Sequence, residues 1–289
     1  DLHRVDRRQR QMCIRDRHGC LVFAQLSHPG REMTLAADGT HPLAYAPSSV
    51  PNERFHVMPR EMPAQLIKEI IEGFAVSATH MRQAGLDGVE LVASHGYLLG
   101  QFLNPNINLR SDVYGGSRAG RMRFLQEAIT AARRGAGEDM ILGVRLSGEE
   151  KDHDGTELGE MLEVCAALDA DPALDYLNVT AGTSAGLAGS THIVPPMAYE
   201  AAYTAPIAAA IKARVSKPVF VAGRINQPQA AAAVLQSGQA DMCGMTRALI
   251  SDPQMPAKAA RGAIDDIRAC VACNQACIGH MLNGCAIQD

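Results

Sequence analysis

Four cysteines lie close together near the end of the sequence, within the stretch RACVACNQACIGHMLNGC. Two residues separate Cys270 from Cys273, three separate Cys273 from Cys277, and seven separate Cys277 from Cys285. Four thiolates in such a cluster can bind one [4Fe–4S] cluster or one Zn²⁺ ion. The spacing alone does not choose between iron–sulfur, zinc and no metal site, so all three readings stay open at this point.

Two arginines follow apolar segments in the second half of the chain. Gly223 and Arg224 come at the end of PVFVAG, and Thr246 and Arg247 come at the end of ADMCGM. A phosphate dianion needs backbone N–H groups that it can approach closely, which glycine permits, and a planar guanidinium that donates to two oxygens. We interpret these residues as a phosphate site. The alternative is two surface arginines that pair with neighbouring carboxylates.

A third arginine, Arg145, lies inside the apolar segment MILGVRL. A charged group that is buried in a strand needs a partner, because removing it from water is otherwise costly. An internal ion pair, for example with Glu90, would supply one partner. A bound anionic group would supply another.

Groups that can transfer protons follow two further apolar segments. His95 and Tyr97 come directly after GVELVA and are two residues apart, so both can project from one turn. His192 stands in the glycine-rich stretch GTSAGLAGSTHIVPPM, after the segment DYLNVT. A lone histidine in a loop more often packs than reacts, and we keep that alternative for His192.

The pattern of apolar residues predicts the elements that position these side chains. Continuous apolar segments alternate with segments of helical periodicity, which predicts a parallel sheet covered by helices. Six strand–helix units are expected, with strands at 21–26, 88–93, 140–146, 175–180, 218–223 and 240–245 and helices at 64–83, 118–134, 158–168, 199–214, 227–237 and 253–262. No G-x-G-x-x-G follows a strand, which speaks against a dinucleotide-binding doubly wound sheet. We expect an α/β fold, a (β/α)8 TIM barrel that lacks two of its eight units.

Length, composition and charge limit the classes of function. The 289 residues are enough for one barrel, and a hydrophobic content of 47% is typical of a folded globular chain. The formal net charge of −4 does not favour a nucleic acid or an anionic membrane as partner, and no run of eighteen apolar residues occurs. We expect a cytoplasmic protein with a small-molecule substrate, and an oligomer is compatible with the sequence.

The first 17 residues differ in character from the rest. They read DLHRVDRRQRQMCIRDR, which is strongly basic and has no hydrophobic period. The string MCIRDR resembles translated sequencing-adapter read-through, and our hypothesis is that residues 1–17 are not native. A basic arm that binds nucleic acid is the alternative.

From about residue 18 to its end the sequence resembles the Old Yellow Enzyme family. The resemblance is carried in order by FAQLSHPGRE, VELVASHGYLLGQFLNPNINLRSDVYGGS, GVRLS, PVFVAGRI and ADMCGMTRALISDP. With the cysteines it resembles the iron–sulfur branch, which includes 2,4-dienoyl-CoA reductase, trimethylamine dehydrogenase and N-methylproline-type demethylases. The resemblance implies a (β/α)8 barrel that holds FMN at its C-terminal mouth, that the chain starts in the third strand, and that residues 18–262 form the FMN-binding part.

The resemblance also implies roles for the arginines and for Gln25. Gly223, Arg224, Thr246 and Arg247 would follow the seventh and eighth strands of the barrel, where barrel enzymes bind phosphate. Arg145 would face the pyrimidine edge of the flavin, which is anionic when the flavin is reduced. Gln25 would bind the pyrimidine carbonyl and N–H through its amide.

For the substrate side, the resemblance implies that residues after the GVELVA strand bind an activating carbonyl or face an amine. Many relatives have His, Asn or Tyr three residues before the histidine, where this chain has Val92. This departure puts a His/Asn carbonyl clamp by His95 in doubt, whereas Tyr97 remains the expected proton donor. The resemblance pairs a histidine from the region of His192 with that tyrosine.

The resemblance favours a [4Fe–4S] cluster in residues 263–289, with Cys270, Cys273, Cys277 and Cys285 as ligands. The last interval is shorter than in relatives, so the fourth ligand could also lie beyond Cys285. The branch carries a region for FAD and NAD(P)H after the cluster, which we expect in a longer protein. The expected activity is hydride exchange between FMN and an enoyl or dienoyl substrate. The alternatives are oxidative demethylation of an N-methylated amine and a zinc-stabilised inactive fragment.

Overall fold

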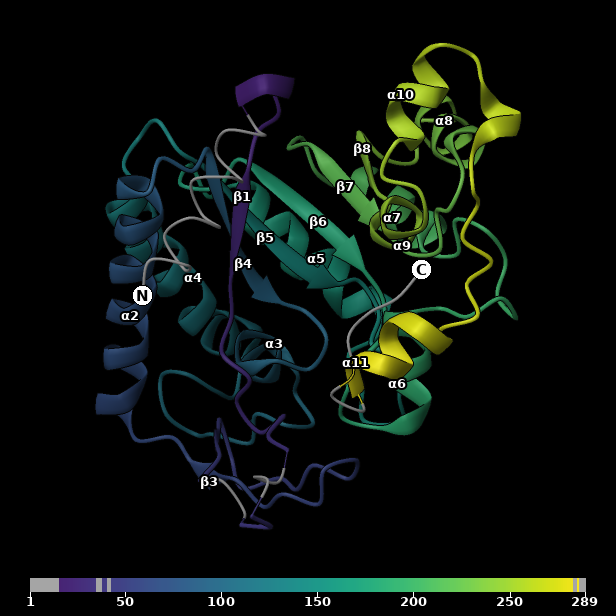
Figure 1. Cartoon of the computed structure of the whole chain (residues 1–289). Helices are drawn as coiled ribbons and strands as arrows, with labels where there is room; N and C mark the ends of the chain where they lie inside the picture. Colours follow the sequence, from purple (N-terminus) through teal and green to yellow (C-terminus); the bar gives the residue numbers. More distant parts are fainter. Residues whose placement is uncertain (1–15, 35–37, 41–42, 283–284, 286–289) are drawn as a thin grey trace.

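The computed structural model describes residues 16–34, 38–40, 43–282 and 285. Most of the N-terminal segment that we interpret as non-native, residues 1–15, lies outside the described residues. The described chain forms one six-stranded parallel sheet in the order β1–β4–β5–β6–β7–β8 (Figure 1). The strands are β1 (Phe23–Leu26), β4 (Gly88–Ala93), β5 (Ile141–Ser147), β6 (Tyr176–Thr180), β7 (Val219–Ala222) and β8 (Met242–Gly244).

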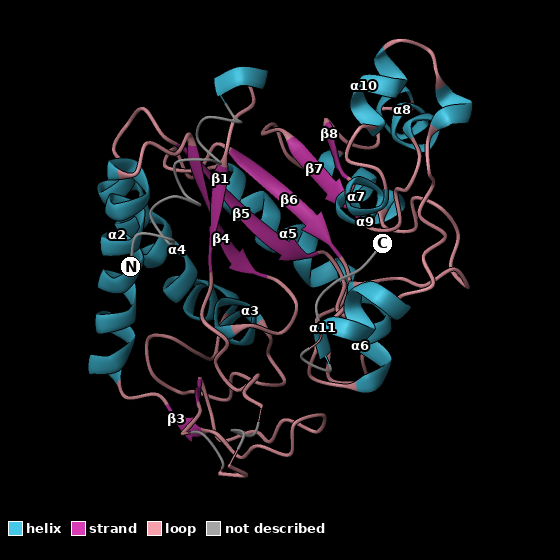
Figure 2. Cartoon of the chain, viewed as in Figure 1, coloured by secondary structure: helices cyan, strands magenta, loops and turns pink. Residues whose placement is uncertain are grey.

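Helices connect each strand to the next and cover the sheet (Figure 2). Long helices return the chain between strands: α2 (Ala64–Gln83), α4 (Arg118–Ala136), α5 (Leu158–Asp169), α7 (Ala205–Lys212) and α8 (Pro228–Gln236). Short helices begin soon after strand ends: α3 (Leu98–Leu103), α6 (Leu187–Ile193) and α9 (Thr246–Ser251). The remaining elements are β2 (Tyr45–Ala46), β3 (Arg60–Glu61), α10 (Met255–Ala260), η1 (Ile264–Asp266), a π-helical turn η2 (Gln275–Gly279) and α11 (His280–Leu282).

The central strands are buried on both faces, which explains their continuous apolar sequence. All six residues of β4 are buried, and β5 and β6 are buried along most of their length. Polar residues interrupt this pattern in one region. Gln25 is in register with Glu90, and Arg145 is in register with Asn178 on the next strand. These polar side chains therefore come from four neighbouring strands.

The expected fold class is confirmed as an α/β fold with a parallel half-barrel sheet. The helix expected at 64–83 and the strand expected at 88–93 have those same bounds. The helix expected at 199–214 spans only Ala205–Lys212, with Pro206 in its first turn, and residues 201–204 before it form turns. No helix among the described residues combines the length and the apolar character that crossing a bilayer requires.

Helices α2 and α4 pack closely against each other, as Figure 1 shows. Gly135 of α4 permits this approach, because a Cβ there would lie 2.1 Å from the carbonyl oxygen of Ala75 on α2. Gly73 of α2, in contrast, has open space around its Cα. The two glycines therefore differ in what a methyl group would meet.

We predict opposite effects of alanine at these two glycines. Gly135→Ala should lower the free energy of unfolding by about 1–3 kcal/mol, because the backbones of α2 and α4 must separate. Gly73→Ala should raise it by roughly 0.5–1 kcal/mol, because alanine is the better helix former. Urea unfolding of the two variants tests this, and an equal response of both would contradict the close packing.

Candidate active site

One large cavity lies at the carboxyl ends of the strands. Its volume is about 940 Å³, which is enough for a cofactor together with a small substrate. Most of the residues singled out in the sequence line it, namely Gln25, His95, Tyr97, Arg145, Gly223, Arg224, Thr246, Arg247, Cys270 and Cys277. His192, Cys273 and Cys285 are not among the lining residues. The cavity thus brings together side chains that are up to about 250 positions apart in the sequence.

Arg145 is a half-buried cation that lines this cavity. Its Nε is enclosed and has no hydrogen-bond partner within the described residues. Burial lowers the pKa of Arg145, and the nearby Glu90 offsets only part of that effect. The ion pair with Glu90 that sequence reasoning kept as an alternative does not form between these two described residues, and Glu90 accepts hydrogen bonds from neutral donors. A cation in this state has unused capacity to bind an anionic ligand.

Glu90 is the acceptor of a small polar network inside the barrel. Its Oε1 accepts a 2.6 Å hydrogen bond from Nε2 of Gln25. Its Oε2 accepts hydrogen bonds of 2.9 Å from the hydroxyl of Tyr176 and from Nδ2 of Asn178. The network fixes the amide of Gln25 and leaves the amide oxygen of Gln25 free to face the cavity.

Arg224 and Arg247 lie after β7 and β8 and are held by backbone carbonyls of the loop 194–197. Nε of Arg224 donates to the carbonyl oxygen of Pro196 at 3.1 Å, and Nη2 of Arg247 donates to that of Pro195 at 3.0 Å. Arg224 has a left-handed backbone, with φ at 52°. Non-glycine residues in that conformation are uncommon and gather at functional sites. Neither arginine has a carboxylate partner in the described chain, so their charges remain available.

Gly223 is required by the close approach of Thr204 beneath it. A Cβ at Gly223 would lie 1.8 Å from Oγ1 of Thr204, which is far inside any permitted contact. Oγ1 of Thr204 is itself buried without a hydrogen-bond partner in the described residues. A side chain at position 223 would therefore displace the strand exit that carries Arg224.

His95 and Tyr97 stand on the turn between β4 and α3. The φ of His95 is 62°, and its ring centroid lies 6.2 Å from that of Tyr97. Nδ1 of His95 is 2.6 Å from Oγ of Ser94, and burial together with the charge of Arg145 lowers the pKa of His95 to about 3. His95 is therefore neutral at physiological pH and cannot serve as a general acid. The hydroxyl of Tyr97 has no hydrogen-bond partner among the described residues and faces the cavity.

His192 is placed differently from the sequence expectation. It lies on α6, and its Nδ1 is 2.8 Å from the hydroxyl of Tyr203. Its ring also stacks on Tyr203 and meets the edge of Tyr199. The tyrosine that it contacts is thus Tyr203 and not Tyr97. Thr191 and Ile193, its neighbours on α6, line the cavity in its place.

The cysteine segment is bonded to the loops that follow the strands. Nδ2 of Asn226 donates to the carbonyl oxygen of Cys270 at 2.7 Å, and the N–H of Met197 donates to that of Ala272 at 2.9 Å. Asn274 accepts a 2.6 Å hydrogen bond from Nη1 of Arg247 and donates to the carbonyl of Val194 at 2.7 Å. Figure 1 shows this yellow segment beside α6. The cysteine segment therefore forms part of the cavity wall, through Cys270 and Cys277.

The individual thiols differ in their surroundings. Sγ of Cys270 accepts a hydrogen bond of 3.4 Å from the N–H of Ala272, a contact that suits a thiolate ligand. Cys273 and Cys285 are exposed, and Cys277 is half-buried and lines the cavity. Thiolates are suitable ligands for a metal cluster, but within the described residues no three of these sulfur atoms all lie within 4.8 Å of one another.

Sequence reasoning missed two charged residues of the cavity, Glu32 and Arg54. Glu32 is only 8% exposed, and its carboxylate accepts hydrogen bonds of 2.8 Å from Nδ2 of Asn52 and from Oγ of Ser184. Burial outweighs these bonds and raises the pKa of Glu32 to about 7. Both residues belong to the long tract 27–62 after β1. The length of that tract was the only sequence signal that pointed to them.

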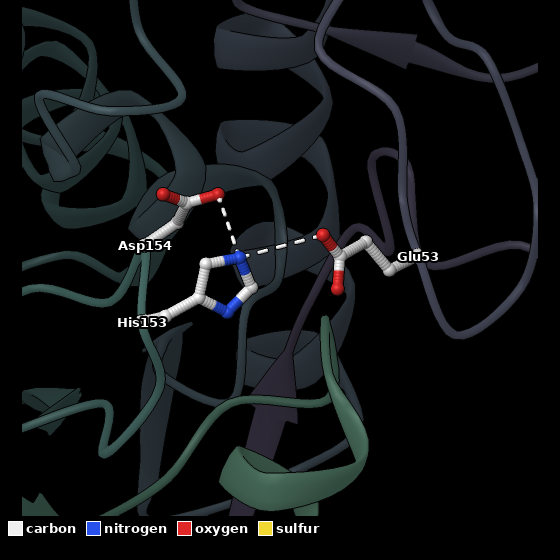
Figure 3. A group of neighbouring side chains, drawn as sticks. All are labelled: Glu53, His153 and Asp154. Carbon is white, nitrogen blue, oxygen red and sulfur yellow. Dashed lines mark ion pairs between the residues drawn. The ribbon is translucent and has the colours of Figure 1, made fainter.

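The loop that carries Arg54 also makes contacts through the neighbouring Glu53. Nε2 of His153 lies 3.4 Å from Oε1 of Glu53 and 3.2 Å from Oδ2 of Asp154, as Figure 3 shows. All three side chains are exposed. The hydrogen bond to Asp152 and the carboxylates of Asp154 and Glu53 raise the pKa of His153. We interpret the group as a surface ion-pair cluster that joins the 52–57 loop to the loop after β5.

Comparisons with known proteins agree with this geometry. The model of the NADH:flavin oxidoreductase / NADH oxidase family matches residues 14–266. The chain is 39% identical over 267 residues to a metal reductase of Desulforamulus reducens, covering 91% of this chain and 38% of that protein. It is 36% identical over 255 residues to a multifunctional alkene reductase/demethylase OYE of Caballeronia cordobensis, covering 88% of this chain and 37% of that protein. The chain thus spans less than half the length of these curated relatives.

A solved structure has the same architecture. The complex of 2-naphthoyl-CoA reductase with 2-naphthoyl-CoA superimposes with a TM-score of 0.85 at 28% identity. The match covers 95% of this chain and 43% of that one. The half-barrel of this chain therefore resembles part of a longer protein of known structure.

The raised pKa of Glu32 predicts a pH-dependent stability. A carboxyl with a folded pKa of about 7, against 4.5 for the unfolded chain, favours the folded state below pH 4.5, and this contribution is lost as the pH rises through 7. The prediction concerns the free energy of unfolding of the wild type relative to that of Glu32→Gln. This difference, wild type minus variant, should fall by roughly 3 kcal/mol between pH 4.5 and 8. Denaturant titrations at several pH values measure this difference.

Glu200→Gln serves as the control, because Glu200 is exposed and lies outside the cavity lining. Its difference from the wild type should stay constant with pH. A constant difference for Glu32→Gln as well would show that Glu32 is not held in a desolvated position.

Proposed function

The chain belongs to the NADH:flavin oxidoreductase / NADH oxidase family, and we propose on this premise that its cavity binds FMN for hydride exchange with an enoyl or dienoyl substrate. The observation that carries the proposal is the enclosed Nε of Arg145, which has no partner among the described residues and shares its cavity with Arg224 and Arg247. In this proposal the six strands correspond to the third to eighth strands of a (β/α)8 barrel.

The residues present fit the two charged ends of FMN. Arg224 and Arg247, with the backbone at Gly223 and Thr246, would bind the phosphate, because their guanidinium groups have no carboxylate partners. Arg145 and the free amide oxygen of Gln25 would bind the pyrimidine edge. Bound FMN would supply two-electron hydride chemistry at this place. Arg145 would favour the reduced flavin, because its charge is already fixed where negative charge develops.

Tyr97 and His95 would serve the substrate. Reduction of an activated alkene needs a proton in addition to a hydride, and Tyr97 offers a hydroxyl that is engaged by no described residue. His95 is neutral and would act through a hydrogen bond that orients the substrate. His192 contacts Tyr203, so a partnership of His192 with Tyr97 would require α6 to shift. We therefore assign His192 a packing role on α6, against Tyr203.

The four cysteines would hold a [4Fe–4S] cluster, which supplies one-electron transfer when it is present. Cys270, Cys273 and Cys277 lie on one short segment that contacts Arg247 through Asn274, and Cys285 is the candidate for the fourth ligand. FAD and NAD(P)H would bind elsewhere in a longer protein, in keeping with the 38% and 37% of the two relatives that this chain spans. A zinc site is the competing use of the same thiols.

Oxidative demethylation of an N-methylated amine is the second candidate function. Glu32 favours it, because a carboxyl that lines the cavity could accept a hydrogen bond from a substrate ammonium or amine. The relative from Caballeronia cordobensis has both activities in its name. In this direction the electrons would enter at the flavin and leave through the cysteine segment.

Anaerobic titration of the FMN-loaded protein separates the two functions. We expect the flavin colour, once bleached by dithionite, to be restored by an α,β-unsaturated substrate; bleaching of the oxidised flavin by N,N-dimethylglycine or N-methylproline would favour demethylation instead. Arg145→Met should lower the midpoint potential of the flavin by roughly 30–60 mV, since a charged contact of about 1.5–3 kcal/mol to the reduced form is lost.

Arg261→Met is the matched control, because Arg261 is exposed and lies outside the cavity lining. It should leave the potential unchanged. A protein that stays colourless with FMN, or an Arg145 variant with the potential of the wild type, would contradict the proposed flavin site.

The metal content is predicted to depend on the cysteine segment alone. The anaerobically purified protein should contain about four iron atoms per chain. Cys273→Ser should lose this iron, whereas Cys20→Ser should keep it, although both thiols are exposed. Elemental analysis and the visible absorption of the cluster measure the outcome. Zinc without iron would support the zinc-stabilised fragment.

A further inference from the structure

We propose that the cavity selects substrates that carry a carboxylate, and that Arg54 is the residue that binds it. The inference deepens the proposed function, because it places the carboxylate in the cavity that is proposed for the flavin and its substrate. It concerns a residue of the long tract after β1, whereas the arginines proposed for the phosphate follow β7 and β8 and line the same cavity.

Arg54 is held in place before any ligand binds. Its N–H donates to the carbonyl oxygen of Ala185 at 3.2 Å, and its Nη1 donates to Oγ of Ser190 on α6 at 2.7 Å. The guanidinium carbon lies 5.1 Å from the centre of the Phe55 ring, which stacks against it. These contacts restrict the side chain, so little conformational entropy remains to be lost on binding.

The charge of Arg54 is not neutralised within the described residues. A guanidinium has five N–H donors, and only one of those of Arg54 is used by a side chain, a neutral hydroxyl. The adjacent Glu53 is turned to His153 on the other side of the loop (Figure 3). Both oxygens of Glu32 accept hydrogen bonds from Asn52 and Ser184. A preorganised cation that lines a cavity and has no acidic partner is a site for an anion.

The position of Arg54 relative to His95 suits a substrate. The N–H of Ser184 donates to the carbonyl oxygen of His95 at 3.0 Å, and the carbonyl oxygen of Ala185, the next residue, accepts from the backbone N–H of Arg54. One short segment therefore connects Arg54 to the turn that carries His95 and Tyr97. A planar, forked guanidinium matches a carboxylate, and a molecule bound there could extend toward Tyr97. In the proposed function, Arg224 and Arg247 after β7 and β8 bind the phosphate of FMN. We therefore favour a carboxylate over a second phosphate as the ligand of Arg54.

The test compares three probes on the FMN-loaded protein. Benzoate and benzamide have the same size and differ in charge, and inorganic phosphate represents the other anion. Dissociation constants are measured from the change that each probe causes in the flavin absorption spectrum. The wild type should bind benzoate at least tenfold more tightly than benzamide, and phosphate should not compete with benzoate.

Variants of Arg54 then assign the effect to this residue. Arg54→Gln should weaken benzoate at least tenfold and leave benzamide within about twofold, whereas Arg54→Lys should retain part of the preference because it keeps the charge. Arg60→Gln is the control, since Arg60 is exposed on β3 and lies outside the cavity lining. It should bind all three probes like the wild type.

Three results would overturn the inference. Equal affinity of the wild type for benzoate and benzamide would do so without any variant. An unchanged benzoate affinity in Arg54→Gln would do so as well, as would phosphate that competes with benzoate at equal strength. All three results can be measured only when flavin is bound, because the probes are detected through the flavin absorption spectrum. A protein that binds no FMN would instead refute the proposed function, so the two failures are distinguishable.

Discussion

An enclosed positive charge without a partner is the constraint on which this site depends. Arg145 lies in the third strand of the sheet, and its Nε reaches no acceptor in the described chain. The nearby Glu90 offsets only part of the cost of burial, and its oxygens accept hydrogen bonds from Gln25, Tyr176 and Asn178. A buried cation is costly unless something compensates it, and here the open side is the cavity. The arrangement is understandable if an anionic group of a ligand completes it.

The loop 194–197 connects the other parts of the site. Its backbone carbonyls hold Arg224, Arg247 and Asn274, which come from two strand exits and from the cysteine segment. The same few peptide groups therefore fix both the proposed phosphate site and the first three cysteines. Because peptide carbonyls carry no net charge, they orient the two guanidinium groups without neutralising them. This explains how two arginines can stay close to each other and still be available to a phosphate.

Much of the fold and part of the site could be predicted from the sequence. Strands such as 88–93 were recognisable because burial on both faces makes them continuously apolar, and the chemistry follows each strand because parallel strands end at one edge. The helix at 199–214 was predicted too long, because its apolar residues include Tyr199 and Tyr203, which pack around His192 in turns. Periodicity does not distinguish such a cluster from a helical stripe.

The residues that sequence reasoning missed depend on tertiary contacts. Glu32 and Arg54 lie in a tract without periodicity, and only the fold brings them against residues 184–190. Likewise, nothing in the sequence indicated that His192 would meet Tyr203 rather than Tyr97. The neutral state of His95 also follows from its enclosure beside Arg145, which strand patterns do not report.

A crystal structure of the chain grown with FMN tests the account most directly. We expect the phosphate to be bonded by Arg224 and Arg247, the pyrimidine edge to lie against Arg145 and Gln25, and Nε of Arg145 to have gained an acceptor. FMN bound outside the cavity, or bound within it while Arg145 still lacks an acceptor, would contradict the claim that this unpaired charge defines a flavin site.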